Sequence, residues 1–363
     1  MQGRTKRSRG GAVRRACMLM AACLFALAPG AAFAEPDVSR ASTPHAADLA
    51  LDFAPLLDLG LDDTIQPKHA YQASEMMLTE LALLHRADLI DPVASSPPDF
   101  RPRRPRHVLQ EARQVYDSIQ SLRYLNGLTH HEMKPTPVRV IMPQDVRRRV
   151  TQGLVELRAL RSVYGVREDV TKPALRDGVT PTHVFASLWR VRAALSALGL
   201  PAVVPNDVYR NARMAAHDIA VIARQQGVSV PPEIEEVAND SVTEDPGKTP
   251  DDAYRLALSA LRHLQVLTHD VPALAIPAGV LVPHEKKGEA KPADVLFVIR
   301  TLLAELNALK VVMGVTAPTP IPPQPVGRTP SDVYDVLRGV RDTIVRIRRD
   351  LAGAEQNEAN RDG

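Results

Sequence analysis

Cysteine is nearly missing from this chain. Its 363 residues contain two, Cys17 and Cys23, and both lie near the N-terminus. If that stretch is removed, the protein has no disulfide, no thiolate metal ligand and no cysteine nucleophile. The sequence also lacks a Cys-x-x-Cys-His segment, which excludes covalently attached haem.

Aromatic residues and the glycine motifs of common enzymes are scarce as well. Phe, Trp and Tyr together make up 4% of the chain. It contains neither the Gly-x-Ser-x-Gly elbow of α/β hydrolases nor a glycine-rich phosphate loop. No motif therefore predicts an enzyme.

The first 34 residues have the order of an export signal. Six basic residues and no acidic one precede an apolar run at 16–30, and Ala32 and Ala34 supply small residues before a cleavage site. We therefore predict a signal peptide at 1–34 and a periplasmic or secreted protein. The minor alternative is a lipoprotein anchored at Cys23. No later stretch offers about 18 uninterrupted apolar residues, so we do not expect an integral membrane protein after cleavage.

Removal of this signal reverses the net charge. The whole chain has 45 basic and 42 acidic residues, a formal charge of +3. Without the six basic residues of the signal, 39 basic residues face 42 acidic ones, a formal charge of −3. Basic composition therefore gives no reason to expect nucleic acid as a partner.

Proline marks eight predicted helix starts. A segment of the form Pro-x-(Asp/His)-(Val/Ala) begins at each of eight positions: Pro67, Pro105, Pro143, Pro181, Pro205, Pro250, Pro292 and Pro330. Proline suits the first position of a helix, and an acidic residue suits the first turn. Thr329 is predicted to cap the last of these helices. Histidine takes the third position at His69, His107 and His183, where we expect a capping or surface role.

Each start is followed by apolar residues at alternating steps of three and four. The seam after Pro330 runs through Val333, Leu337, Val340, Ile344, Ile347 and Leu351. Such stepping places a narrow apolar stripe on one face of a helix, as in bundles packed like coiled coils. The chain is therefore predicted to be all-α, with eight amphipathic helices joined by proline-rich connections.

The helices repeat at a second level. Residues 143–192 align with 292–341 without a gap and are identical at 19 of these 50 positions. SLRYLNGLTHH (121–131) also resembles ALRHLQVLTHD (260–270). We predict a tandem duplication of a four-helix unit, with an N-terminal extension at 35–65, units at 66–200 and 201–353, and a disordered tail at 354–363. The long connections permit either parallel neighbours or an up-and-down bundle.

Few residues qualify as ligands. His130 and His131 are predicted to end the second helix and His269 its counterpart, where a histidine also suits the negative end of the helix dipole. Tyr71 and Tyr209 occupy matching places in the first turns of two helices, either packing the bundle end or forming a ligand rim. Glu156 and Glu305 recur within Glu-Leu-x-Ala-Leu, beside the seam, and are expected to be solvated.

The functional expectation follows from what the two units share. Both keep helix starts, seams and proline-rich loops, while no constellation of titratable residues is kept with them. We predict a non-enzymatic interaction or ligand-binding module of the periplasm, with no cofactor and with an unknown protein or small molecule as partner. The alternative is a bundle that binds a metal or cofactor through inter-helix histidines, although no Glu-x-x-His pair marks a metal site.

Overall fold

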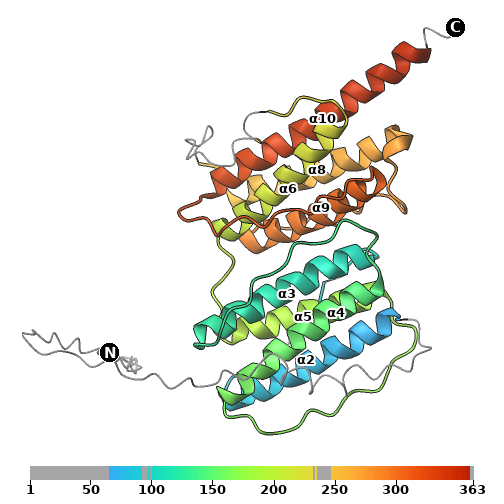
Figure 1. Ribbon diagram of the computed structural model, residues 1–363. Coiled ribbons are helices and arrows are strands. Elements are labelled where there is room, and N and C mark those ends of the chain that lie inside the picture. Colours follow the sequence, from blue (N-terminus) through green and yellow to red (C-terminus); the bar gives the residue numbers. More distant parts are fainter. Residues whose placement is uncertain (1–64, 92–96, 99, 232–233, 235–246, 360–363) are drawn as a thin grey trace, which may run out of the picture. The chain divides into compact units, whose positions relative to one another are not determined.

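The computed structural model describes residues 65–91, 97–98, 100–231, 234 and 247–359, which contain eight α-helices and no strand (Figure 1). The all-α prediction is confirmed for this part of the chain. The predicted signal peptide, the extension up to residue 64 and residues 360–363 lie outside the described residues. None of the described helices is both long enough and apolar enough to cross a membrane.

Every helix begins at a predicted proline. The helices are α2 (Pro67–Ala87), α3 (Pro105–Leu125), α4 (Pro143–Arg158), α5 (Pro181–Ala197), α6 (Pro205–Gln225), α8 (Pro250–Asp270), α9 (Pro292–Val312) and α10 (Pro330–Ala359). Short 3₁₀ helices follow α4 at Ala159–Ser162 and α8 at Pro272–Leu274. The backbone of α10 continues past residue 353, where the second unit was predicted to end.

The third residue of each helix caps its start. In all eight helices the backbone N–H of the residue before the proline donates to this third side chain, which is Asp in five helices and His in three. Thr329 also accepts from the backbone of Asp332, at 3.3 Å. The capping roles predicted for Thr329, His69, His107 and His183 are confirmed.

The helices form two bundles with the same packing order. In the first bundle, α2 packs against α4 and α5, and α3 packs against the same two helices. In the second bundle, α6 packs against α9 and α10, and α8 packs against the same two (Figure 1). Taken in chain order, the four helices of the first bundle therefore pack against one another in the same pattern as the four helices of the second.

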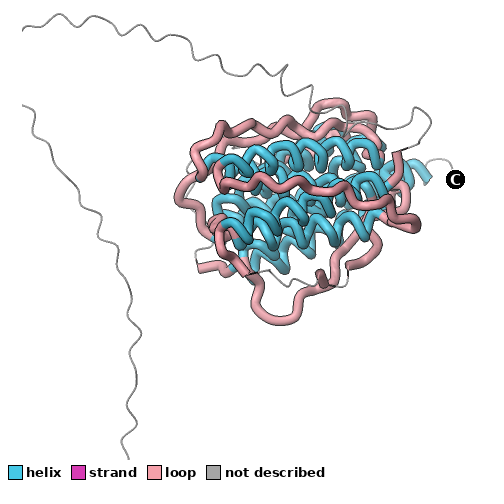
Figure 2. The backbone as a smooth tube through the Cα atoms, turned by 90° about the horizontal axis from the view of Figure 1, so that it is seen from below, coloured by secondary structure: helices cyan, strands magenta, loops and turns pink. Residues whose placement is uncertain are grey.

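All four helices of a bundle run in the same direction. Along α2 and α5, Ser74 contacts Ser187 and, further on, His85 contacts Ala194, both at 2.8 Å. The connecting segments run back along the helices (Figure 2). Three of the connections, such as 126–142 between α3 and α4, have 17 residues. When extended, 17 residues span about 53 Å, whereas a 21-residue helix is about 31 Å long. The structure therefore has the parallel arrangement, one of the two that the sequence allowed.

The second bundle runs against the first. Residues 198–204 join α5 to α6 and are too short to return along a helix, so the chain continues in the opposite direction. The main packing across this junction is between α3 and α9. His107 at the start of α3 contacts Glu305 late in α9, whereas Asp117 contacts Arg300 earlier in α9.

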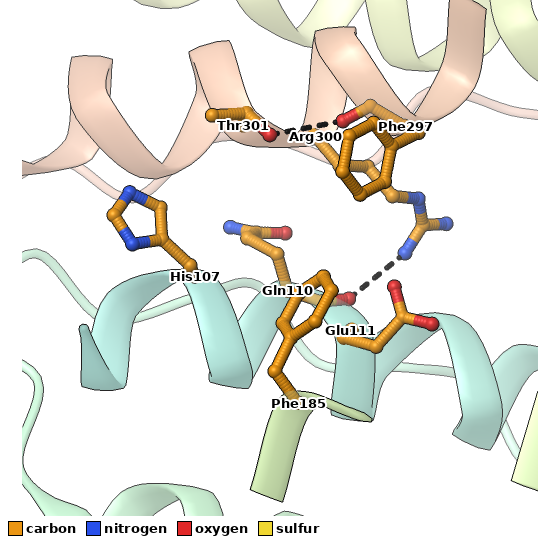
Figure 3. A pocket seen from close by; sticks show the side chains of 7 residues that line it. All are labelled: His107, Gln110, Glu111, Phe185, Phe297, Arg300 and Thr301. Atoms are coloured by element: carbon orange, nitrogen blue, oxygen red, sulfur yellow. Dashed lines mark hydrogen bonds between the residues drawn. The ribbon is translucent and has the colours of Figure 1, made fainter. Parts of the chain in front are cut away.

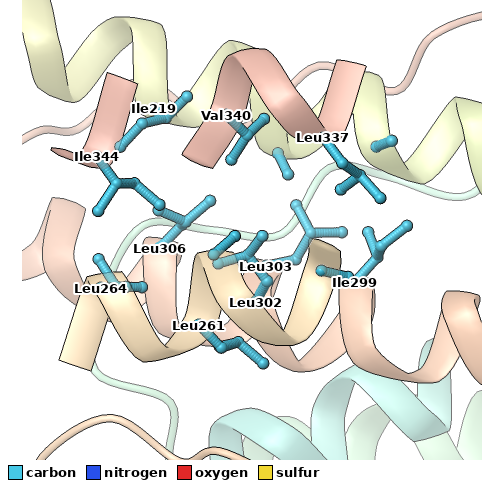
Figure 4. Close-up of a cluster of buried hydrophobic side chains, with 14 of the residues drawn as sticks. Ile219, Leu261, Leu264, Ile299, Leu302, Leu303, Leu306, Leu337, Val340 and Ile344 are labelled. Carbon is cyan, nitrogen blue, oxygen red and sulfur yellow. The ribbon is translucent and has the colours of Figure 1, made fainter. Parts of the chain in front are cut away.

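The predicted seams form the bundle cores. Residues of α6, α8, α9 and α10 interdigitate in the second bundle, where Leu302, Leu337 and Ile344 are fully buried (Figure 4). Helix α9 is apolar over most of its circumference, because it faces both its own bundle and α3.

Candidate functional site

Each bundle buries an acid of its first helix, and a base from another part of the bundle binds this acid. In the first bundle Glu80 accepts from Arg158 and Arg161, both at 2.7 Å. In the second, Asp218 binds Lys310 at 2.6 Å and the hydroxyl of Thr319 at 2.8 Å. Removing one partner of such a pair would leave an uncompensated buried charge and should destabilise the fold.

The positions of these pairs match between the bundles. Glu80 and Asp218 are each the fourteenth residue of their helix, and Arg161 and Lys310 are each nineteenth counted from the helix-starting proline. A matched pair also joins helix starts, since the backbone N–H groups of Arg103 and Lys248 donate to Thr182 and Ser331, each at 2.9 Å. The two bundles therefore share specific polar contacts as well as packing order.

A small pocket lies at the junction of the bundles. His107, Gln110 and Glu111 of α3 face Phe297, Arg300 and Thr301 of α9, with Phe185 of α5 beside them (Figure 3). Its volume of about 10 Å³ suits at most a single water. Nearby, the guanidinium of Arg103 lies within 5.5 Å of the ring centres of Phe100, Phe185 and Phe297. This junction is a packed interface and has no room for a ligand.

Glu305 is the central charge of this junction. Its side chain is fully buried and binds Nε2 of His107 at 2.7 Å, Arg106 at 2.8 Å and the backbone N–H of Leu281 at 2.8 Å. The expectation that Glu305 is solvated was wrong, because α9 is covered on its outer side by α3. Glu156, its counterpart, is 17% exposed and binds Arg123 and His131.

The helix cap fixes the protonation of His107. Its Nδ1 accepts the backbone N–H of Arg104 at 3.0 Å, so the proton must be on Nε2, which donates to Glu305. A second proton would break the cap. Burial lowers the pKa of His107 to about 4, although the bond to Glu305 opposes this shift.

Acid should weaken the fold through His107. Unfolded His107 takes up a proton near pH 6.5, whereas the folded side chain stays neutral until about pH 4. The unfolded state binds more protons in this window, so stability falls as the pH falls. We expect a loss of about 2–3 kcal/mol between pH 7 and pH 4.5 from this group.

The variant His107→Asn removes this contribution, together with the bond from His107 that lowers the pKa of Glu305. Asparagine retains a neutral acceptor for the cap, as the aspartates do in five other helices, but it does not titrate. Urea unfolding at several pH values should show a shallower pH dependence in His107→Asn than in the wild type. Equal slopes would contradict a buried neutral His107.

The histidines predicted as ligands are not brought together. His130 and His131 lie in the loop beyond α3 and are exposed, and His131 binds Glu156 at 2.8 Å. His269 lies in the last turn of α8, with 87% of its side chain exposed, and contacts Asp270. The two Leu-Thr-His stretches are not structural equivalents, because one follows its helix and the other lies within it. No described residues form a group of three His, Cys, Asp or Glu able to hold a metal.

Tyr71 lies in the largest surface groove of those described. This groove of about 530 Å³ runs between α2, α5 and the connection before α5, and we call it the α2–α5 groove. Its apolar lining includes Leu78, Ala82 and Ala174. Its polar lining includes Glu75, which binds Arg190, and Arg176. An aromatic ring, an apolar floor and arginines form a surface suited to another polypeptide.

The corresponding position of the second bundle is filled by the chain itself. Ile234, from the connection after α6, is 2% exposed and lies against Gly339 of α10. A Cβ atom on Gly339 would lie 3.0 Å from the Ile234 side chain, so glycine leaves the space that isoleucine fills. Arg213 donates to the Ile234 carbonyl at 3.3 Å.

Matching positions place Ile234 at the counterpart of the α2–α5 groove. Glu75 and Arg213 are each the ninth residue of their helix, and Arg190 and Gly339 are each the tenth. Ala82 is exposed, whereas its counterpart Ala220 is 3% exposed. Among the residues that the structure describes, the first bundle thus has a groove where Ile234 covers the second.

Tyr209, the counterpart of Tyr71, lies against an arginine. The guanidinium of Arg328 lies 4.7 Å from the centre of its ring. Arg210, next to it, donates to the carbonyl of Pro322 at 2.8 Å. The first bundle has the equivalent contact, because Gln72 of α2 donates to the carbonyl of Pro173 at 2.5 Å, so each connection lies over the start of the first helix of its bundle. Of the pockets described, one borders Tyr71, whereas Tyr209 lies against Arg328.

The sequence patterns did not identify Glu75, Arg190 and Ile234. The sequence does differ between the units at these places: Glu75 and Arg190, which form an ion pair, correspond to an arginine and a glycine in the second unit. A lone glycine inside a helix costs about 1 kcal/mol relative to alanine, so Gly339 needed a packing reason. The chain matches no protein-family model, no curated protein and no solved structure.

Proposed function

We propose that this chain is an exported, non-enzymatic interaction module, and that its α2–α5 groove is the surface that binds a partner. The observation that carries the proposal is the difference between the bundles. The second bundle buries Ile234 beside Gly339, while the first leaves Leu78 and Ala82 accessible in a groove. Exposed apolar surface in a concave site is typical of an interface.

Tandem duplication and export belong to the same proposal. Duplication is supported by the matched packing order and polar contacts of the two bundles. Export is supported by the order of basic, apolar and small residues at 1–34. The buried groups Glu80, Asp218 and Glu305 stabilise the fold and are not exposed to a substrate.

Capture with groove variants tests the function. Ala82→Glu places a charged side chain in the groove at an exposed helix position, with little expected effect on stability. Ala87→Glu makes the same change on α2 outside the groove. A periplasmic protein should be retained by the wild type and by Ala87→Glu, and at least about tenfold less by Ala82→Glu, a loss of about 1.4 kcal/mol.

Two results would contradict the proposal. Equal retention by all three proteins would exclude the groove as the binding surface. Near-stoichiometric metal or a visible absorption band in the natively purified chain would favour the alternative function, a metal- or cofactor-binding bundle.

A further inference from the structure

The second bundle shows what chemistry can cover the side of such a bundle. Its occupant is one branched aliphatic side chain, buried against a helix pair and bonded through its backbone carbonyl to Arg213. In the sequence this residue lies among acids, as Glu233-Ile234-Glu235-Glu236. In the sequence, this apolar anchor is therefore flanked by acidic residues.

The α2–α5 groove has complementary features. Leu78, Ala82 and Ala174 provide an apolar surface for a single aliphatic side chain. Arg176 is exposed at its edge, and the side chain of Arg190 is 35% exposed while it binds Glu75. Because Arg190 takes the position of Gly339, the anchor would lie further along α2, beside Leu78 and Ala82. Its acidic neighbours would then be close to the two arginines.

Resting on the proposed function, we infer that the partner presents a short acidic segment with a branched aliphatic anchor, like residues 230–238 of this chain. The aliphatic side chain packs on Leu78 and Ala82, and the flanking carboxylates bind Arg176 and Arg190. Such a contact buries one main side chain, so a free peptide should bind weakly.

Titration with a peptide tests this chemistry. The probe is VPPEIEEVA, the sequence of residues 230–238, added to the exported chain with labelled leucine methyl groups. We expect the NMR signals of Leu78 to shift with a dissociation constant in the range measurable for weak ligands. Ala82→Glu should weaken binding at least about tenfold, and Ala87→Glu should leave it unchanged.

Matched peptides separate the apolar anchor from the acids. A peptide carrying Ile234→Asp should lose the Leu78 shifts, and a peptide with lysine in place of its glutamates should bind at least about tenfold more weakly. Equal binding of either control would overturn the inference, as would shifts confined to the second bundle. Concentration-dependent Leu78 shifts without peptide would also overturn it, since the occupant would then be a second copy of the chain.

Failure of this inference differs from failure of the proposed function. If VPPEIEEVA does not bind, yet Ala82→Glu still loses its captured partner, the groove binds a partner of other chemistry. If the peptide does not bind and capture is also insensitive to Ala82→Glu, both proposals are wrong.

Discussion

Replacing Gly153 by leucine should destabilise the chain by about 2–3 kcal/mol, and Met77→Ala added to it should restore most of that loss. Gly153 lies within α4, where a Cβ atom would be 2.6 Å from Cε of Met77 and 3.4 Å from Cδ1 of Ile119. The methionine of α2 fills the space that glycine leaves.

At the same positions of the second bundle, the small residue lies on the first helix and the large residue on the third. Ala215 and Leu302 are the counterparts of Met77 and Gly153, and both are fully buried. A large residue on one helix and a small one on the next thus fill the contact in either order. Volume-conserving exchanges of this kind are tolerated best in a packed core.

The double variant tests whether Met77 and Gly153 fill this contact together. Met77→Ala alone removes a fully buried side chain and should cost about 2–5 kcal/mol. The pair Met77→Ala and Gly153→Leu should unfold in urea within about 1 kcal/mol of the wild type, a coupling typical of residues in contact. Additive losses would show that the two bundles do not pack their equivalent positions alike.

Local rules predicted the helices well. Proline at the first position and Asp or His at the third define each start chemically, so all eight starts could be located from the sequence. The seams were equally clear, because Leu337, Val340 and Ile344 follow one helix face. Such features depend on residues within a few positions of one another.

Helix direction could not be predicted in the same way. A connection of about 17 residues is long enough to return along a helix, but it does not require this path. The parallel order is fixed by contacts distant in sequence, such as Ser74 with Ser187. The burial of Glu305 depends on the packing of α3 against α9, which the seam within α9 does not specify.

The site was predicted least well. Tyr71 was chosen for its matching position and does line the groove, but His130, His131 and His269 are exposed residues on separate elements. Within the described residues, the groove contrasts with the second bundle, where Ile234 lies against Gly339. Repeats in the sequence do not reveal such a contact, because it depends on the path of a connection between helices.

Thiol labelling of Ala82→Cys and Ala220→Cys tests the central claim most directly. A chain prepared without residues 1–34 contains no other cysteine, so each variant reports a single position. Ala82 is exposed and Ala220 is 3% exposed, although they are equivalent residues of α2 and α6. We expect Cys introduced at position 82 to react as fast as a free thiol, and Cys at position 220 at least about 100-fold more slowly, because its labelling requires local opening. Equal rates would show that the two bundles are open alike, which would contradict the account.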